Sequence, residues 1–403
     1  MKIVYLHQYF KTPRVNGGVR SYHFARALRA EGHEVHVITS DTSESGPRSG
    51  TSMVDGLVVH RIRVPYDNSM GFVRRVIAFL DFAVRASLRA RSLRADVVVA
   101  TSTPLTIAIP ALWAVVGRPA RFVFEVRDLW PTVPIAMGLL RNPVLIKVAR
   151  MLEMATYRRA DAIVALSQGM AEGVVQTSSS FADKVVVIPN IADVETFRQS
   201  APAESAASRT ISALGDRPVV LYSGTFGRVN GLKYMVQLAE AARSANVPCA
   251  FVAVGDGAER QDVEDEARRT GLLGTWFFTL PPVTKEELPA LLQLATFGSS
   301  WVIDVPALEH NSANKFFDTL AAGRPMLINH GGWQAAVLER MGAGWRLDRD
   351  AVLAVEQLRV ILADADLVAD AGRAALALAE NAYSLKLLSR LFTSVVVPPV
   401  ATP

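Results

Sequence analysis

The sequence predicts an α/β protein built from two doubly wound parallel-sheet domains that face a central cleft. The chain has 403 residues, which is too long for one ordinary core. Near-continuous apolar strands alternate with helical patterns, as is typical of parallel sheets covered on both faces. The alternation stops after Phe197 and then restarts. We therefore expect two similar halves with a ligand at the carboxyl ends of their strands.

The first half, residues 1–198, contains strand-like runs separated by helical patterns. The runs are KIVYLH, EVHVITS, LVVHRIRV, DVVVATS, RFVFEV, AIVALS and KVVVIP. Helical patterns cover Val19–Ala30, Phe72–Arg94 and Pro143–Arg159. Val97–Gly117 has no charged residue, but Pro104 and Pro110 interrupt it. We expect a buried strand, a loop and a buried helix there rather than a membrane span.

The second half begins with RQSAPAESAASRTISALGDRP, a Ser-, Ala- and Pro-rich stretch that we interpret as a linker or long connection. Residues 199–382 then repeat the alternation. Strand-like runs are PVVLYSG, CAFVAVG, TWFFTL, FGSSWVI and PMLIN, and helices are expected near Leu232–Ser244, Glu259–Thr270, Lys285–Leu294 and Asn314.

Composition and charge narrow the functional classes. An apolar content of 50% argues against disorder. The single cysteine, Cys249, excludes a disulfide framework and a cysteine-based metal site, and it fits a reducing cytosol; we see no secretory signal. Residues 1–198 carry 25 Lys+Arg against 16 Asp+Glu, so anionic partners should approach this half. Because no nucleic-acid motif is present, we expect no nucleic-acid partner and favour an anionic membrane surface.

The run Ser312–Pro325, SANKFFDTLAAGRP, is the most informative stretch. Small and polar residues, among them Ser312 and Asn314, begin an apolar helical pattern, and free N–H groups there favour an anion. Lys315 adds a cation, and Asp318 lies about one turn further on the same face. The stretch is either a sugar-diphosphate site or an ordinary N-capped helix.

Glycines follow several predicted strands. Gly17 and Gly18 lie between the first strand and its helix, where backbone can approach a phosphate or sugar; the spacing is no dinucleotide fingerprint. Gly224 begins GTFGRVNGL, in which Arg228 is either a diphosphate ligand or a solvated turn residue. In VGDGAER, Gly255 and Gly257 are expected mainly to shape a turn.

The segment FEVRDLWP places polar side chains just past a strand. Asp128 could orient or deprotonate an acceptor hydroxyl, and Trp130 could stack on a sugar ring; the alternative is that Arg127 and Asp128 pair to brace the loop. Histidines 7, 23, 33, 36, 60, 310 and 330 show no metal spacing, although His7 and His310 at strand ends could touch substrate.

Phe72–Ala95 reads as a basic amphipathic helix. Six arginines flank apolar positions, at 74, 75, 85, 89, 91 and 94. The helix either lies in an anionic membrane interface or packs on the core with a basic outer face.

Taken in order, these motifs resemble the retaining glycosyltransferases of family 4, which have the GT-B fold of two Rossmann-like domains. The resemblance covers nearly the whole chain, from MKIVYLHQYF and NGGVR through FEVRDLWP, VVVIPNIADVETF and YSGTFGRVNGL to NKFFDTLAAGRPMLIN. RDLWP and the Asn314 helix look most like bacterial L-fucosamine-type transferases of surface-polysaccharide assembly. The resemblance implies that residues 383–403 return to the first domain.

The chain departs from the family pattern at several positions. Many members have His-Asp where this chain has Arg127-Asp128. Thr225 and Asn230 replace an Arg and a Lys of the phosphate loop, which leaves Arg228 and Lys315 as the expected cations. Asp318 matches the carboxylate that usually contacts the ribose, and His310 falls at the first carboxylate of the family's pair.

The resemblance implies a metal-independent, retaining transferase without a cofactor. It would move a sugar, expected to be a UDP-linked amino sugar, to a lipid-linked saccharide at the cytoplasmic face of the membrane. The catalytic candidates are Asp128, Arg228 and Lys315. The donor would also contact Gly17, Gly18, Gly224, Thr225, His310, Ser312, Asn314 and Asp318, and Arg127 and Trp130 would lie on the acceptor side. Two alternatives stay open: a nucleotide-sugar epimerase of the same fold, and a non-catalytic partner of a transferase.

Overall fold

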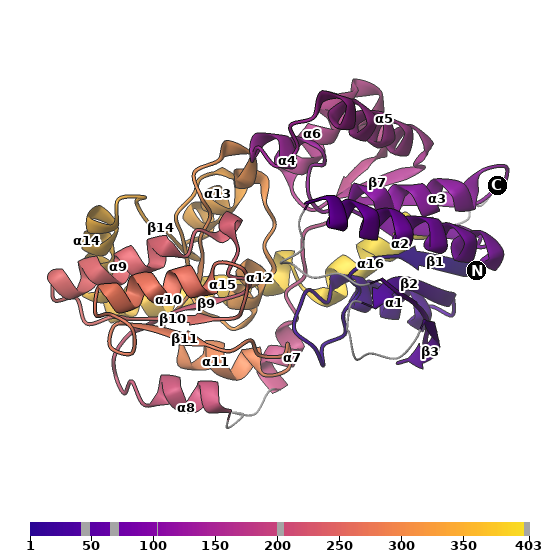
Figure 1. Ribbon diagram of the computed structural model, residues 1–403. Coiled ribbons are helices and arrows are strands. Elements are labelled where there is room, and N and C mark those ends of the chain that lie inside the picture. The colour runs from indigo at the N-terminus through magenta and orange to yellow at the C-terminus, as the bar shows by residue number, and fades with distance from the viewer. Residues whose placement is uncertain (42–48, 65–71, 103, 200–204, 399–403) are drawn as a thin grey trace.

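The first domain is built on an eight-stranded sheet (Figure 1). The structure is a computed structural model that describes residues 1–41, 49–64, 72–102, 104–199 and 205–398. The sheet order is β3-β4-β2-β1-β5-β6-β7-β8. Its strands are β1 Lys2–Leu6, β2 Glu34–Asp41, β3 Gly50–Val54, β4 Leu57–Arg63, β5 Val97–Thr101, β6 Arg121–Val126, β7 Ala162–Ala165 and β8 Val185–Val187. All neighbours are parallel except β3 and β4, which form an antiparallel edge.

Helices cover both faces of this sheet because its central strands are apolar on both sides. On one face lie α1 Arg20–Ala30 and α16 Leu385–Val396. On the other lie α2 Phe72–Leu93, α3 Ala108–Val115, α5 Pro143–Arg159 and α6 Gln168–Thr177. The short helix α4 Thr132–Ala136 lies next to the second domain (Figure 1).

The second domain repeats this plan on a fully parallel six-stranded sheet of order β11-β10-β9-β12-β13-β14. The strands are β9 Val219–Ser223, β10 Ala250–Val254, β11 Phe277–Leu280, β12 Phe297–Ser300, β13 Met326–Ile328 and β14 Gly344–Arg346. One face carries α9 Lys233–Ser244, α10 Arg260–Arg269 and α14 Ala351–Leu362. The other carries α8 Ala206–Ser212, α11 Leu288–Leu294, α12 Asn314–Ala321, α13 Gly332–Met341 and α15 Ala365–Ala382.

Two segments cross between the domains side by side. Ala192 N–H donates to the carbonyl of Tyr383 at 2.8 Å, and Leu385 N–H donates to the carbonyl of Ala192 at 3.1 Å. Helix α7 Val194–Gln199 already packs into the second core, so the chain leaves the first domain a few residues before position 198. After the crossing, α16 packs against β1 and α1 of the first domain.

The structure differs from the sequence-based expectation in one of two stretches and confirms the expectation in the other. The stretch interpreted as a linker contains α8, which begins with a capping box formed by Ser205 and Ser208; residues 200–204 lie outside the described residues. Within 97–117 the chain forms β5, the 3₁₀ turn Leu105–Ile107 and α3. Across the described ranges, no helix is both long and apolar enough to cross a bilayer.

Candidate functional site

A polar pocket of about 370 Å³ lies between the two domains. It sits at the carboxyl ends of β1, β6, β7 and β8 and at the amino end of α12, where a doubly wound fold places its ligand. Its lining residues are His7, Tyr9, Lys11, Gly17, Gly18, Arg127, Asp128, Leu166, Asn190, Asn311, Ser312, Ala313 and Asn314. Six of the residues singled out in the sequence line this pocket together: Gly17, Gly18, Arg127, Asp128, Ser312 and Asn314.

Gly18 is the point of close approach between the domains. A Cβ atom on it would lie 2.8 Å from Asn314 Nδ2 and 3.5 Å from Arg127 Nη2. Gly17 beside it has a φ of +138°, which side-chain-bearing residues rarely adopt. Both glycines therefore allow the loop before α1 to face the second domain.

His7 is held neutral beside a cation. Arg127 Nη1 lies 3.1 Å from His7 Nε2, and burial, followed by the charges of Arg127 and Lys11, lowers the pKa of His7 well below its usual value. Because a guanidinium only donates, Nε2 accepts and Nδ1 carries the proton. Among the described residues Nδ1–H has no hydrogen-bond partner. His7 is thus a neutral side chain of the pocket wall, next to a cation.

Asn190 and Ser312 join the domains and leave polar atoms unpaired. Asn190 Nδ2 donates to the carbonyl of Ser312 at 2.5 Å. Within the described parts of the chain, Asn190 Oδ1 and Ser312 Oγ have no partner, although both residues are buried. A buried unpaired polar group costs about 1–3 kcal/mol, so these atoms favour a polar ligand or water in the pocket.

Helix α12 starts without a side-chain cap. Ala313 is its N-cap residue, and its methyl side chain has no oxygen to accept hydrogen bonds from the first N–H groups. The alternative of an ordinary side-chain-capped helix is therefore wrong. The helix has eight residues, and its amino end faces the polar pocket through Asn314.

Lys315 lies against the first glycine loop of the second domain. Its Nζ donates to Asn230 Oδ1 at 3.2 Å and lies 4.7 Å from the centre of the Tyr222 ring. Loss of water around the ammonium group lowers the pKa of Lys315 to about 8. A Cβ atom on Gly224 would lie 2.9 Å from Lys315 Cε. Helix α12 thus places a cation beside Asn230 and Gly224.

Thr225 takes part in this loop through its backbone. Its carbonyl accepts hydrogen bonds from Tyr222 Oη at 2.8 Å and from Asn230 Nδ2 at 2.9 Å. These bonds fix the loop whose Gly224 allows Lys315 to approach.

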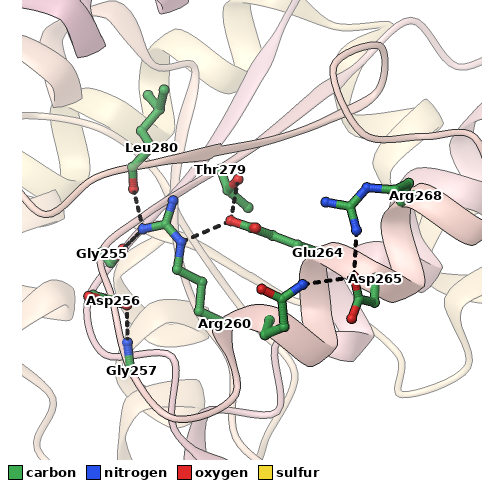
Figure 2. A network of polar contacts seen from close by, with 10 residues as sticks. Gly255, Asp256, Gly257, Arg260, Glu264, Asp265, Arg268, Thr279 and Leu280 are labelled. Atoms are coloured by element: carbon green, nitrogen blue, oxygen red, sulfur yellow. Dashed lines mark hydrogen bonds and ion pairs between the residues drawn. The ribbon is translucent and has the colours of Figure 1, made fainter.

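Two glycine loops support each other at the ends of β9 and β10. A Cβ atom on Gly255 would lie 1.9 Å from the carbonyl oxygen of Gly224, and one on Gly257 would lie 2.5 Å from that of Phe226. Figure 2 shows how Arg260 braces the second loop: it donates to the carbonyl of Gly255 at 2.7 Å and pairs with Glu264 at 2.8 Å. The glycines thus serve close backbone packing beneath Lys315.

Asp318 is not open to a ligand as the sequence suggested. Its carboxylate is buried and paired with Lys285, a residue from the loop after β11. Burial raises the pKa of Asp318, and the Lys285 charge partly opposes that shift. Contact with a ribose would require Lys285 to move.

Three predicted residues line other cavities. Arg228 borders a cavity of about 320 Å³ together with Arg349 and Tyr234. Trp130 and His310 border an apolar pocket of about 230 Å³, which shares Asp128 and Asn311 with the polar pocket. Arg228 is therefore separated from the pocket lining that contains Asp128.

Sequence reasoning missed Lys11, Asn190 and Lys285. Lys11 lies in the long loop HQYFKTPRVNGG, whose unusual length was the available signal. Asn190 directly follows the run KVVVIP, so its place after a strand could have marked it. Nothing in the local pattern around Lys285 indicates its pairing with Asp318.

Comparisons with known proteins agree with this architecture. Residues 17–191 match the family model described as a glycosyl transferase 4-like domain. A protein of Escherichia coli K12, WcaI, named as a colanic acid biosynthesis glycosyl transferase, is 25% identical over 283 residues, which are 66% of this chain and 68% of that protein.

Solved structures resemble the whole chain. Sucrose-phosphate synthase from Thermosynechococcus elongatus has a TM-score of 0.76 at 17% identity, and HepE from Anabaena, in complex with UDP and glucose, has 0.70 at 16%; each comparison covers 98% of both chains. Residues 17–191 therefore match a glycosyl transferase 4-like domain within a chain of the GT-B fold, and together these findings support a glycosyltransferase.

Proposed function

We propose that the protein is a retaining glycosyltransferase of bacterial surface-polysaccharide assembly. It moves an amino sugar from a UDP donor to a lipid-linked saccharide. The observation that carries the proposal is the inter-domain pocket, whose lining joins the uncapped start of α12 to Arg127 and Asp128 and includes residues with unpaired polar atoms. The UDP bound to HepE supports UDP as the nucleotide of the donor, and the colanic acid role in the name of WcaI supports a part in polysaccharide assembly.

The second domain binds the donor in this proposal. Lys315 and the N–H groups at the start of α12 stabilise the diphosphate as negative charge develops on it. Arg228 contacts the donor only if the loop before α9 shifts, because in the structure it borders another cavity. Lys285 releases Asp318 toward the ribose when the nucleotide binds.

The first domain binds the acceptor. Asp128 orients the acceptor hydroxyl, whose oxygen bonds to the sugar C1 as the bond from C1 to the diphosphate breaks. The hydroxyl proton leaves to Asp128 or to the departing phosphate oxygen. Attack from the face of the departing group retains the configuration at C1.

Membrane contact through α2 is part of the proposal. Its inner side chains, including Ala78, Phe82 and Ala86, pack on the core. Four apolar side chains stay 46–67% exposed in one stripe: Ile77, Leu80, Val84 and Leu88. The side chains of residues 72, 73, 75 and 76 lie outside the described residues. We expect a peripheral protein at the cytoplasmic face of the membrane.

A nucleotide panel tests the proposal. Thermal shifts with UDP, GDP, CDP and TDP should single out UDP, since a ligand that binds the native state raises its melting temperature. UDP-amino sugars plus a lipid-linked saccharide should then yield UDP and an elongated lipid, with and without EDTA.

The same assay separates the alternatives. A rearranged nucleotide sugar without acceptor would mean an epimerase, and no turnover with any donor would favour a non-catalytic partner. Loss of turnover in EDTA would overturn metal independence.

A further inference from the structure

The apolar pocket beside the polar pocket is unexplained by sugar and nucleotide chemistry. It lies between α4 and the 3₁₀ turn Pro306–His310, and its walls include Trp130, Val133, Met137 and Leu308. It shares Asp128 and Asn311 with the polar pocket, so the two cavities adjoin at the residue proposed to meet the acceptor hydroxyl. A ligand reaching from one to the other would have a polar end at Asp128 and an apolar remainder.

One residue of this pocket lies a few positions before an exposed apolar helix face in the chain. Leu139 lines the pocket and is 55% exposed, and α5 begins shortly after it at Pro143. On α5, Val144, Val148 and Met151 are 66%, 56% and 62% exposed. Their spacing of four and three residues places them in one stripe. Together these three side chains form an exposed apolar patch, the α5 stripe.

Charge around this stripe has one sign. The exposed charged side chains of residues 139–158 are Arg141, Lys147, Arg150 and Arg158. The single acidic residue of that stretch, Glu153, is buried. An apolar stripe bordered by cations complements an anionic lipid surface, and α3, which packs between α2 and α5, extends this face with the half-exposed Trp113.

We propose that the apolar pocket receives the first part of the lipid chain of a prenyl-diphosphate-linked acceptor, while the α5 stripe lies on the anionic bilayer that delivers it. The inference rests on the proposed function and adds the place where the lipid binds. The exposed cations Arg141, Lys147 and Arg150 then lie near the lipid headgroups.

Vesicle co-sedimentation tests the α5 stripe without any need for catalysis. Vesicles of phosphatidylglycerol and phosphatidylethanolamine should retain the protein, and Val148→Glu/Met151→Glu should reduce the bound fraction at least tenfold. The control is Val352→Glu/Val360→Glu on α14, where both side chains are similarly exposed, at 64% and 71%, and the charge change is equal. If the α5 variant and the α14 control are retained equally by the anionic vesicles, the α5 stripe does not bind the membrane. Equal binding of the wild type to vesicles of pure phosphatidylcholine would also overturn the proposed contact with an anionic bilayer.

Calorimetry with farnesyl diphosphate tests the pocket. The wild type should bind this probe at least tenfold more tightly than inorganic diphosphate, and Leu139→Glu at the exposed rim should abolish the difference while leaving UDP affinity unchanged. Equal affinity for the two probes, with UDP still bound, overturns the inference and leaves the proposed function standing. A wild type that binds the farnesyl probe but no nucleotide fails the proposed function instead.

Discussion

Lys315 holds its proton only weakly, and this makes nucleotide binding dependent on pH. Its ammonium loses water against Tyr222 and Asn230, which lowers its pKa to about 8. The charged form binds a diphosphate, so UDP affinity should be full well below pH 8 and fall as the pH rises through 8 toward 9.5. Calorimetry across this range should show the fall in the wild type.

Replacement of Lys315 should remove that pH dependence. Lys315→Met loses a charge-assisted contact of about 1.5–3 kcal/mol, so UDP affinity at pH 7 should drop roughly ten- to hundredfold. Lys386→Met, which removes an exposed cation from α16, should bind UDP normally. If Lys315→Met kept the wild-type slope above pH 8, another group would be responsible.

Arg20 ties together three segments of the pocket. The side chain is fully buried, donates to Glu125 Oε1 at 2.7 Å and to the carbonyl of Ile188 at 2.8 Å, and also bonds the carbonyl of Pro189. It lies two residues after Gly18, while Glu125 precedes Arg127 and Pro189 precedes Asn190. One guanidinium therefore fixes the glycine loop, the Asp128 loop and Asn190 relative to one another.

Arg20→Met should leave Glu125 buried without its partner and lower the free energy of unfolding by about 3–5 kcal/mol. Arg26→Met on the exposed side of α1 should cost no more than about 0.5 kcal/mol. Urea unfolding of the two variants measures these free energies. Similar midpoints would show that the buried pair contributes little.

At the scale of elements, the glycine loops after β9 and β10 should tolerate no side chain at Gly255. Its φ is +146°, and an added Cβ would overlap the carbonyl oxygen of Gly224. We expect Gly255→Ala to displace the loop beneath Lys315 and weaken UDP binding at least tenfold. Gly274→Ala is the control, because its φ is also positive, at +80°, yet nothing lies within 4 Å of the new Cβ. Gly274→Ala should lower the free energy of unfolding by about 1–2 kcal/mol and leave the affinity for UDP unchanged.

Helix α16 shows how the chain end stabilises the first domain. Phe392 is fully buried, and its ring stacks on Phe24 with centroids 4.2 Å apart. Phe392→Ala should therefore lower the free energy of unfolding of the first domain by about 3–5 kcal/mol. Leu391 beside it is 37% exposed, so Leu391→Ala should cost far less. Equal losses in thermal unfolding would contradict this packing.

Helices and strands could be predicted where their apolar residues followed a clear pattern in the sequence. Buried parallel strands such as RFVFEV are apolar runs, and they could be recognised directly. Edge strand β3, GTSMV, is mostly exposed and has no such pattern, so it was missed. Helix α8 was hidden because Pro and Ser around it indicate loops, although its Ala-rich core favours helix.

The site was predictable where it followed from local motifs and not where it depended on distant contacts. Gly18, Asp128 and Asn314 each follow a strand or begin a helix, so the fold alone brings them to one crevice. The pairing of Lys285 with Asp318 depends on how the loop after β11 lies over α12, which no periodicity encodes. The same holds for Lys315 beside Asn230.

At the scale of the whole molecule, the two domains meet at close contacts between polar side chains and backbone. Ser167 Oγ donates to the carbonyl of His310 at 2.8 Å, beside the bond from Asn190 to Ser312. Gly169, near the start of α6, faces the His310 ring so closely that a Cβ would lie 1.9 Å from Nδ1. The absence of a side chain at Gly169 thus allows the domains to close at this point.

Gly169→Ala should hold the crevice partly open. The methyl group must displace the His310 turn from α6, and the acceptor and donor residues then separate although each domain stays intact. We expect the transfer rate to fall at least tenfold while UDP affinity, which depends on the second domain, changes little. Small-angle X-ray scattering should show a larger radius of gyration.

A double-variant cycle tests whether contact with the His310 ring causes the slower transfer of Gly169→Ala. His310→Ala removes the ring that the new methyl group meets, so Gly169→Ala/His310→Ala should be no slower than His310→Ala alone, and its radius of gyration should return to the wild-type value. If the two losses instead multiplied, the effect of Gly169→Ala would come from α6 itself and not from the meeting of the domains.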